Sequence, residues 1–245
     1  KPNYPKNVTL TDLFNGNGNL TWENPGNVGA NGYFVNPDLI TYNVYNTSGD
    51  TLLYHSPATQ LSVSGLPQTG DQELVQYGVS ANNRTGEGDI MASSVLITGT
   101  PYSLPFHESF SNGQTHYGMW WFDYGNQSNG WYLNGSLSAD DDGGSVYWYD
   151  RTGAEDAYCT MSTGKINVTG ATKPVLEFSY YYNGGNFKID VTCENSTQSN
   201  TLVKEINFAQ EPNPSQFGWR TVFVDLTPEL AKATAANPYF VLHFT

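Results

Sequence analysis

Short stretches in which apolar and polar residues alternate recur along almost the whole chain. Leu20 and Trp22 share one face of such a stretch, and Asn-Pro-Gly at 24–26 ends it. Successive side chains of a strand point to opposite faces, so a period of two predicts half-buried β-strands. Long helices need more Ala, Leu, Glu, Lys and Arg than this chain supplies. The sequence therefore predicts an all-β protein.

A proline-containing connector at 100–105 divides the 245 residues into two domains. Pro101 and Pro105 stand among small polar residues, which makes a short, stiff segment. Short predicted strands separated by turn residues fill positions 1–100, a pattern typical of a β-sandwich. In 101–245, strand patterns return after a stretch rich in Trp, Gly and Asn. The predicted domains are therefore 1–100 and 101–245.

Two elements of the second domain are predicted in detail. Leu176, Phe178, Tyr180 and Tyr182 place apolar side chains on one face of a strand. The one convincing helix begins at Thr227, where the threonine is expected to cap it and the following proline suits the first turn.

The charge of the chain excludes several classes of partner. Ten Lys and Arg residues against 23 Asp and Glu give a net charge of −13. A nucleic-acid binder needs a cationic surface, and attachment to anionic lipid is disfavoured for the same reason. No apolar run is long enough to predict a membrane span. No signal peptide is visible, and we interpret the chain as a mature or trimmed piece of a longer secreted protein.

The first half resembles a fibronectin type III domain over essentially its full length. The matching segments follow the order of that family's strands: Leu20 to Trp22, Tyr42 to Tyr45, Leu66-Pro67, Tyr77 to Ala81, and Asn83 to Gly86. The long segment between Trp22 and Ile40 departs from the pattern and is predicted to be a loop. The resemblance implies a module that spaces and supports its neighbours.

The second half resembles the jelly-roll modules of Bacteroidetes surface proteins, the cleaved-adhesin and MAM-like group. The resemblance is carried by Pro105 to Phe110, Glu155 to Tyr158, Pro174 to Tyr181, Trp219 to Leu226, and Phe240 to Phe244. It implies a jelly-roll β-sandwich. The family continues into one more strand with an Asp-rich end, so the resemblance implies either that this domain lacks its last strand or that the strand follows Thr245.

A run of acidic residues is a candidate calcium site. Asp140, Asp141 and Asp142 repel one another, and a hard cation would relieve that repulsion. The resemblance places calcium between the opening strand and such loops. The predicted ligands are Glu108, Asp123, Asp140, Asp142 and, from a second acidic pair, Asp156. The alternative interpretation is a solvated acidic turn, because the spacing is not that of an EF-hand.

Clustered aromatic residues between 120 and 150 are candidates for binding sugars. Their faces can stack on the apolar faces of sugar rings, while nearby Asn, Asp and Gln bind the hydroxyls. The predicted ligand-binding residues are Trp120, Trp121, Tyr124, Trp131 and Trp148. The alternative is that these side chains fill the core, although adjacent residues of a strand point to opposite faces, so at most one of the first two can do so.

Signals for catalysis or a disulfide framework are poor. Neither a zinc-protease nor a serine-hydrolase motif occurs, and none of the four His residues has ligand-like spacing. Cys159 and Cys193 both lie among apolar neighbours, where they could pair or stay as buried thiols. We therefore predict a protein that is not an enzyme.

These observations together predict a secreted or cell-surface protein, associated with the outer membrane. Its expected role is non-catalytic adhesion or binding of glycans or host glycoproteins, with Ca²⁺ as the candidate cofactor. It is expected to be a monomer without nucleic-acid partners or direct membrane insertion. Two alternatives stay open: accessory modules of a larger secreted protease or glycoside hydrolase, and a purely structural spacer.

Overall fold

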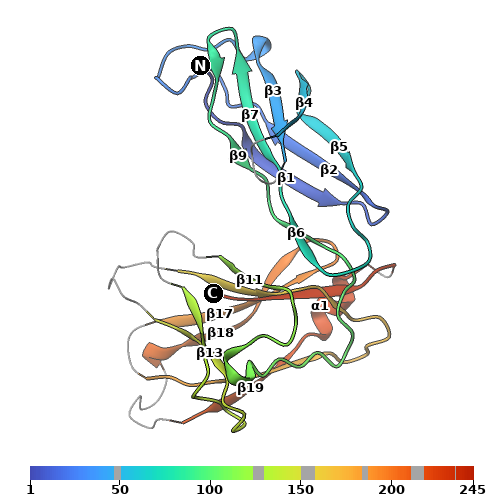
Figure 1. The fold of residues 1–245 in the computed structure, drawn as a ribbon, viewed down its shortest axis with the longest axis vertical. Helices are drawn as coiled ribbons and strands as arrows, with labels where there is room; N and C mark the ends of the chain where they lie inside the picture. Colours follow the sequence, from blue (N-terminus) through green and yellow to red (C-terminus); the bar gives the residue numbers. More distant parts are fainter. Residues whose placement is uncertain (47–50, 124–129, 150–157, 184–186, 211–217, 235) are drawn as a thin grey trace. The chain divides into compact units, whose positions relative to one another are not determined.

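A computed structural model describes residues 1–46, 51–123, 130–149, 158–183, 187–210, 218–234 and 236–245 (Figure 1). The chain divides into two compact units, Lys1–Thr100 and Pro101–Thr245, which we call unit 1 and unit 2. Antiparallel strands dominate both units, so the prediction of an all-β protein is confirmed. Among the described residues, no helix has the length and apolar composition of a membrane span.

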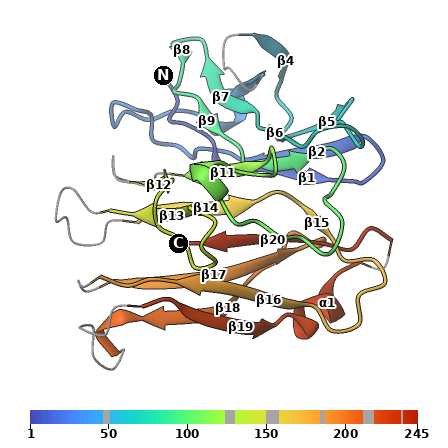
Figure 2. The ribbon, with the colours of Figure 1, turned by 60° about the horizontal axis from the view of Figure 1, so that its bottom comes forward.

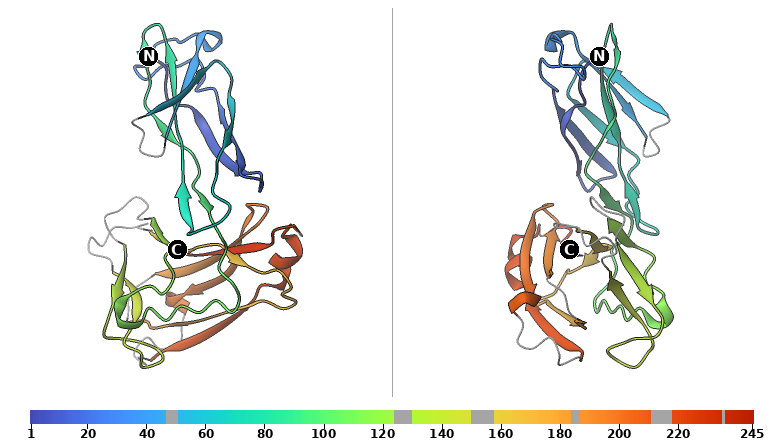
Figure 3. Two further views of the ribbon diagram at one scale, coloured as in Figure 1. Left: turned by 45° about the vertical axis from the view of Figure 1, so that its right-hand side comes forward. Right: turned by 90° about the vertical axis from the view of Figure 1, so that its left-hand side faces the viewer.

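Unit 1 consists mainly of two antiparallel sheets, whose strands can be followed from blue to green in Figure 3. One sheet has the order β1 (Lys6–Asp12), β2 (Asn17–Glu23), β5 (Gln60–Ser64). The other has the order β4 (Leu52–Ser56), β3 (Thr41–Tyr45), β7 (Gly78–Asn83), β8 (Gly86–Glu87), with β9 (Met91–Ala92) also paired to β7. A short ladder joins β10 (Leu96–Thr98) to β6 (Glu73–Val75).

The core of unit 1 lies between its two sheets. Leu20 and Trp22, predicted to share a face, are both buried there. The Trp22 ring meets Tyr42 edge to face, with centroids 5.5 Å apart, and Val44 and Val79 complete the facing layer. This is the β-sandwich that the alternating pattern predicted.

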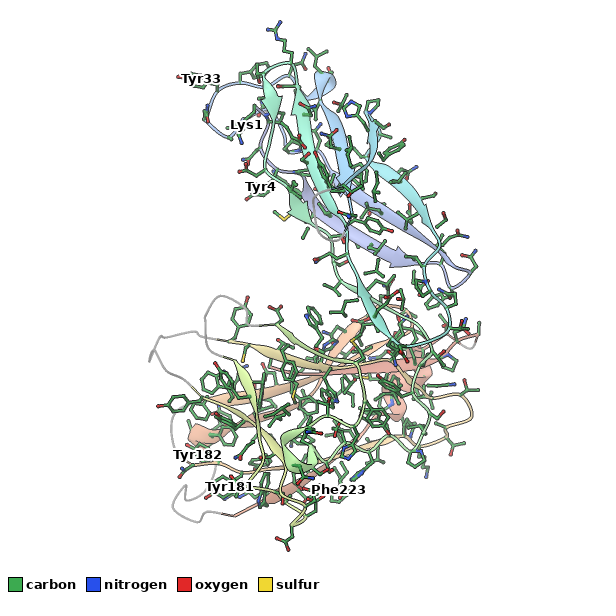
Figure 4. The ribbon with its side chains drawn as sticks, viewed as in Figure 1. Lys1, Tyr4, Tyr33, Tyr181, Tyr182 and Phe223 are labelled. Carbon is green, nitrogen blue, oxygen red and sulfur yellow. The ribbon has the colours of Figure 1, made fainter. Side chains whose placement is uncertain are left out.

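The segment between Trp22 and Ile40 is more ordered than the predicted loop. Val28 bridges Phe34, and the 3-10 helix η1 (Pro37–Leu39) follows. At the end of the turn that closes this bridge, Tyr33 is 78% exposed (Figure 4) and Phe34 is 75% exposed. Gly32 has a φ of +77°, which a glycine adopts without strain at such a tight turn.

Unit 2 is built around a six-stranded antiparallel sheet, of which β14, β20 and β17 run side by side in Figure 2. Its order is β11 (Trp120–Asp123), β14 (Thr160–Thr163), β20 (Tyr239–Phe244), β17 (Lys188–Asn195), β18 (Asn200–Asn207), and β15 (Ile166–Asn167) also pairs with β20. Two separate ladders are β12 (Trp131–Asn134) with β13 (Ser145–Trp148), and β16 (Val175–Tyr180) with β19 (Arg220–Asp225). Short helical turns are η2 (Ser111–Gly113), η3 (Phe208–Gln210) and α1 (Thr227–Lys232).

The core of unit 2 lies between the large sheet and the β16–β19 ladder. Cys193, Phe240 and Leu242 of the large sheet pack in one cluster with Leu176 and Phe178. Tyr180 and Tyr182 continue the same inner face and pack against Phe208, so the predicted apolar face of this strand is confirmed. Every second residue of β16 and β19 therefore points away from the core.

The helix α1 begins where the sequence placed it, but its capping differs from the prediction. The Thr227 side chain does not cap the helix, because the residue before the first turn is Leu226, which makes no side-chain capping bond. The Asp225 carboxylate accepts a hydrogen bond from the Thr227 backbone N–H at 2.9 Å instead. An aspartate side chain can accept a hydrogen bond from the backbone N–H two residues further on, and this turn takes the place of a threonine cap here.

The two cysteines are free, buried thiols in the structure. Burial raises the pKa of Cys159 to about 11 and that of Cys193 to about 12. Since the thiolate is the reactive form, Ellman's reagent at pH 8 should modify the folded protein at least about a hundredfold more slowly than the urea-unfolded protein. An intact mass that rises by two hydrogens on reduction would show a disulfide instead.

Candidate functional site

The Glu108 carboxylate occupies the centre of the segment that opens unit 2. Its side chain is 3% exposed. One oxygen, Oε1, accepts hydrogen bonds from the Phe110 backbone N–H at 2.9 Å and from His116 Nδ1 at 2.8 Å. The other, Oε2, accepts from the His116 backbone N–H at 2.9 Å and from Trp120 Nε1 at 3.0 Å, with the Tyr117 N–H more distant at 3.4 Å. This one carboxylate thus fixes the backbone from 108 to 120.

The electrostatics of Glu108 follow from those contacts. Burial opposes its ionisation, but the donors from His116, Phe110 and Trp120 outweigh burial, and the pKa lies below its ordinary value. N–H groups already fill the lone-pair positions of both oxygens, and a cation would have to displace them. In the structure, Glu108 therefore acts as an anchor for the loop, and its role as a metal ligand stays a prediction.

The remaining predicted metal ligands are only partly brought together. Asp142 lies beside Ser109, Asp140 and His116; the hydrogen bond from Ser109 is the largest of the effects that lower its pKa. Asp123 ends β11, where its charge acts on Cys159, and Asp156 lies outside the described residues. Within the described parts of the chain, no group of three or more His, Cys, Asp or Glu residues could hold a metal ion. The calcium site stays a prediction.

Gly144 brings the acidic turn and the opening segment into direct contact. A Cβ atom placed there would lie 1.8 Å from the Phe110 carbonyl oxygen and 2.5 Å from the Ser111 Cα. The Gly144 N–H also donates to Asp142 Oδ1 at 3.1 Å. The two backbones can approach this closely only because the residue has no side chain.

The predicted aromatic platform is divided among separate places. Trp120 donates its indole N–H to Glu108, and its ring packs on Phe110 with centroids 5.0 Å apart. Trp121 points to the other face of β11 and lies opposite Ser162 in the neighbouring strand. Tyr124 lies outside the described residues.

Trp131 and Trp148 form a pair across the β12–β13 hairpin. Trp131 Nε1 donates to the Cys159 carbonyl oxygen at 3.3 Å, and the Trp148 ring meets Phe187 edge to face at 5.2 Å. The opposite side of the hairpin presents Tyr132 and Tyr147, whose centroids are 5.6 Å apart; Tyr147 is 43% exposed. Trp131 and Trp148 therefore contact other residues of the protein. The two tyrosines lie on the other side of the hairpin.

A second group of aromatic and polar side chains, which the sequence did not single out, lies on the outside of the β16–β19 ladder. Three directly opposed pairs alternate with the inward-facing ones: Ser179 with Thr221, Glu177 with Phe223, and Val175 with Asp225. One position beyond the ladder, the rings of Tyr181 and Trp219 are in contact and continue the same row. Ser179 and Trp219 are half-buried, and the other six residues are exposed. We call these eight residues the outer face. Tyr181 and Phe223 lie along the same margin of unit 2 in Figure 4, and Phe223 is 66% exposed.

Contacts between neighbours hold the outer face in position. The rings of Tyr181 and Trp219 lie 5.8 Å apart, and the hydroxyls of Ser179 and Thr221 are hydrogen-bonded at 2.9 Å. Behind them, Tyr182 stacks on Phe208 with centroids 4.2 Å apart and nearly parallel planes. The ladder thus presents aromatic rings, hydroxyls and two carboxylates on a support that is packed from within.

One arrangement in the structure has the residue types of a nucleophilic site. Ser162 Oγ lies 2.8 Å from His243 Nδ1, and His243 Nε2 lies 3.6 Å from Glu194 Oε2. A serine, a histidine and a carboxylate side by side are the residue types of a catalytic triad, but the two ring nitrogens are exchanged relative to the serine-protease arrangement, which has serine at Nε2 and the carboxylate at Nδ1. Ser162 is completely buried, however, so a substrate has no path to its hydroxyl in this conformation. Sequence spacing gave no sign of this group because its members come from three strands.

Comparison with known proteins gives only distant likenesses. No family model matches the chain, and no curated protein does. A solved structure described as "Structural basis for the promiscuous specificity of the carbohydrate-binding modules from the beta-sandwich super family" is 10% identical, with 100% of this chain and 92% of that chain covered and a TM-score of 0.37. The chicken CNTN1 FN1-FN3 domains are 10% identical over 100% of this chain and 94% of theirs, with a TM-score of 0.27. A structure described as "FN3tt mut" is 14% identical over 40% of this chain and 97% of its own, with a TM-score of 0.30. Likenesses this distant do not indicate what the chain binds.

Proposed function

We propose that this protein is a non-catalytic glycan-binding protein that acts outside the cell or at its surface. The outer face of β16–β19 is the observation that carries the proposal. It combines the exposed rings of Tyr181 and Phe223 and the half-buried ring of Trp219 with the paired hydroxyls of Ser179 and Thr221. Sugars expose apolar ring faces and hydroxyl groups together, so a ligand of that chemistry matches both kinds of group on the face.

Physical chemistry favours this face over the predicted tryptophan platform. Trp120 donates its indole N–H to Glu108, and Trp131 and Trp148 pack toward Cys159 and Phe187. Using those rings to bind a ligand would break contacts that stabilise the fold. On the outer face, Tyr181 and Phe223 are already exposed, and the contact between Tyr181 and Trp219 holds two of the rings side by side. Preorganised groups lose less conformational entropy on binding.

The role fits two settings that differ only in what surrounds the chain. In an adhesin, the outer face would attach the protein to glycans or glycoproteins. In a larger secreted protease or glycoside hydrolase, the same face would hold the enzyme on its substrate. Unit 1 would act as a spacer in either setting.

Replacing Tyr181 and Trp219 with alanine tests the proposal. A buried aromatic contact contributes about 1 kcal/mol beyond its buried area, so losing both rings should weaken glycan binding by at least tenfold. Binding to an array of immobilised glycans and to soluble hexasaccharides, with the affinity from calorimetry, gives the measurement.

Two further variants serve as controls for that experiment. Tyr147→Ala removes an exposed ring from the β12–β13 hairpin and should leave binding unchanged. The double variant Trp121→Ala and Trp131→Ala tests the platform predicted from the sequence. Loss of binding in that double variant, with full binding in Tyr181→Ala and Trp219→Ala, would move the site to the hairpin region.

A further inference from the structure

We propose that the outer face binds a neutral, linear glycan that lies along the strands and contacts several of its sugar units. This inference rests on the proposed function and adds the class of ligand. Two features of the face carry it: the spacing of its rows and the sign of its charges.

The spacing of the rows sets the length of the ligand. Glu177 with Phe223 is one row of this face, and Tyr181 with Trp219, one position beyond the ladder, is another, four residues away along each chain segment. At the rise of an antiparallel strand, that separation is about 13 Å. One pyranose ring cannot span this distance, so a ligand that contacts both aromatic rows must extend over several sugar units. The hydroxyl row of Ser179 and Thr221 would then face the sugar between them.

The charges of the face decide between neutral and acidic glycans. Glu177 and Asp225 contribute carboxylates. The Thr227 hydroxyl and N–H hold the pKa of Asp225 below its ordinary value, and Lys173 nearby acts in the same direction. A uronate or sulfate group stacked beside Phe223 would meet the charge of Glu177, and the chain as a whole carries −13. A neutral glycan meets no such repulsion and can donate hydroxyl hydrogens to the carboxylate.

The test compares hexasaccharides of equal length at low salt. Cellohexaose, xylohexaose and mannohexaose are the neutral probes, and hexagalacturonic acid is the acidic one. We expect at least one neutral probe to bind tenfold or more tightly than the acidic probe, and to lose affinity as it is shortened to two sugars. Glu177→Gln should narrow the difference between the neutral and acidic probes, and so should raised salt, which screens exposed charges.

The possible failures can be told apart. Equal or tighter binding of hexagalacturonic acid would overturn the inference while leaving the proposed function intact, provided that Tyr181→Ala with Trp219→Ala abolishes that binding. Undiminished affinity for a disaccharide would likewise overturn an extended site. Absence of binding to every probe, or binding that ignores Tyr181 and Trp219, would refute the proposed function and this inference with it.

Discussion

Replacing Glu108 with glutamine is expected to lower the free energy of unfolding of unit 2 by about 3 kcal/mol. Glutamine keeps one carbonyl oxygen as an acceptor. Its NH₂ group, however, is a donor, and it would face N–H groups that now donate to the second carboxylate oxygen. The His116 side chain, the Trp120 indole and the backbone N–H groups would then compete for one oxygen. Buried donors left without an acceptor account for the loss. Urea unfolding followed by tryptophan fluorescence measures it.

Glu205→Gln is the matched control for this experiment. Its carboxylate is 46% exposed and lies 3.3 Å from Lys188 Nζ, so the change should stay within about 0.5 kcal/mol. If Glu108→Gln were no more destabilising than Glu205→Gln, the carboxylate would not be holding the opening segment.

Glu108→Gln should also remove one contribution to the pH dependence of the stability of unit 2. The pKa of Glu108 is lowered in the folded protein from its ordinary value of 4.5, so its ionised form stabilises the fold. That contribution is fully present above pH 4.5 and is lost as the pH falls through the lowered folded value. The stability difference between the wild type and Glu108→Gln should therefore shrink as the pH is lowered below 4.5. A difference that stayed constant down to acid unfolding would contradict this role for the charge.

Gly144→Ala is expected to cost about 3 kcal/mol, a large effect for the addition of one methyl group. The new Cβ would overlap the carbonyl oxygen of Phe110 and crowd the Cα of Ser111. Both are backbone atoms, which cannot turn aside as a side chain can. Relief would require the opening segment to move away from the acidic turn and would disturb the bonds around Glu108. Thermal and urea unfolding give the size of the effect.

Gly118→Ala provides the comparison for Gly144. A Cβ at Gly118 meets nothing within 4 Å, so alanine there should leave stability nearly unchanged or raise it slightly by restricting the unfolded chain. Equal stability of the two alanine variants would show that the close approach at Gly144 is not a constraint on the fold.

Much of the architecture could be predicted because it depends on local patterns. The alternation of Leu20 with Trp22, and of Leu176 with Phe178, assigns each side chain to a face whatever the strand pairs with. The sequence therefore predicted correctly which side chains of β2 and β16 face the core. The capping of α1 was wrong, because threonine and aspartate both suit the position and the backbone alone decides between them.

The candidate site was harder to predict because aromatic residues serve cores and ligands equally well. Trp131 looked like an exposed platform, but its indole N–H is used by the Cys159 carbonyl, 28 residues away. The alternation that placed Tyr180 in the core also placed Tyr181 outside, so one signal of the outer face was present. Its pairing with Trp219 is set by strand register, which the sequence does not encode locally.

The surroundings of the carboxylates were hard to predict for a related reason. Composition shows how many acidic residues a loop contains, but not which hydrogen-bond donors the fold brings to them. Glu108 was grouped with Asp140 and Asp142 as an oxygen ligand, whereas five N–H groups from residues 110–120 surround it. Only the folded chain shows that its acceptor positions are filled.

The indole N–H signals of the six tryptophans offer the most direct test of where the protein binds glycans. They can be assigned by single Trp→Phe substitutions and followed by NMR during titration with cellohexaose, xylohexaose and mannohexaose. We predict that the Trp219 signal shifts with saturation while the signals of Trp131 and Trp148 stay in place. Saturable shifts at Trp121, Trp131 or Trp148 with an unmoved Trp219 would contradict the account and return the site to the region between 120 and 150.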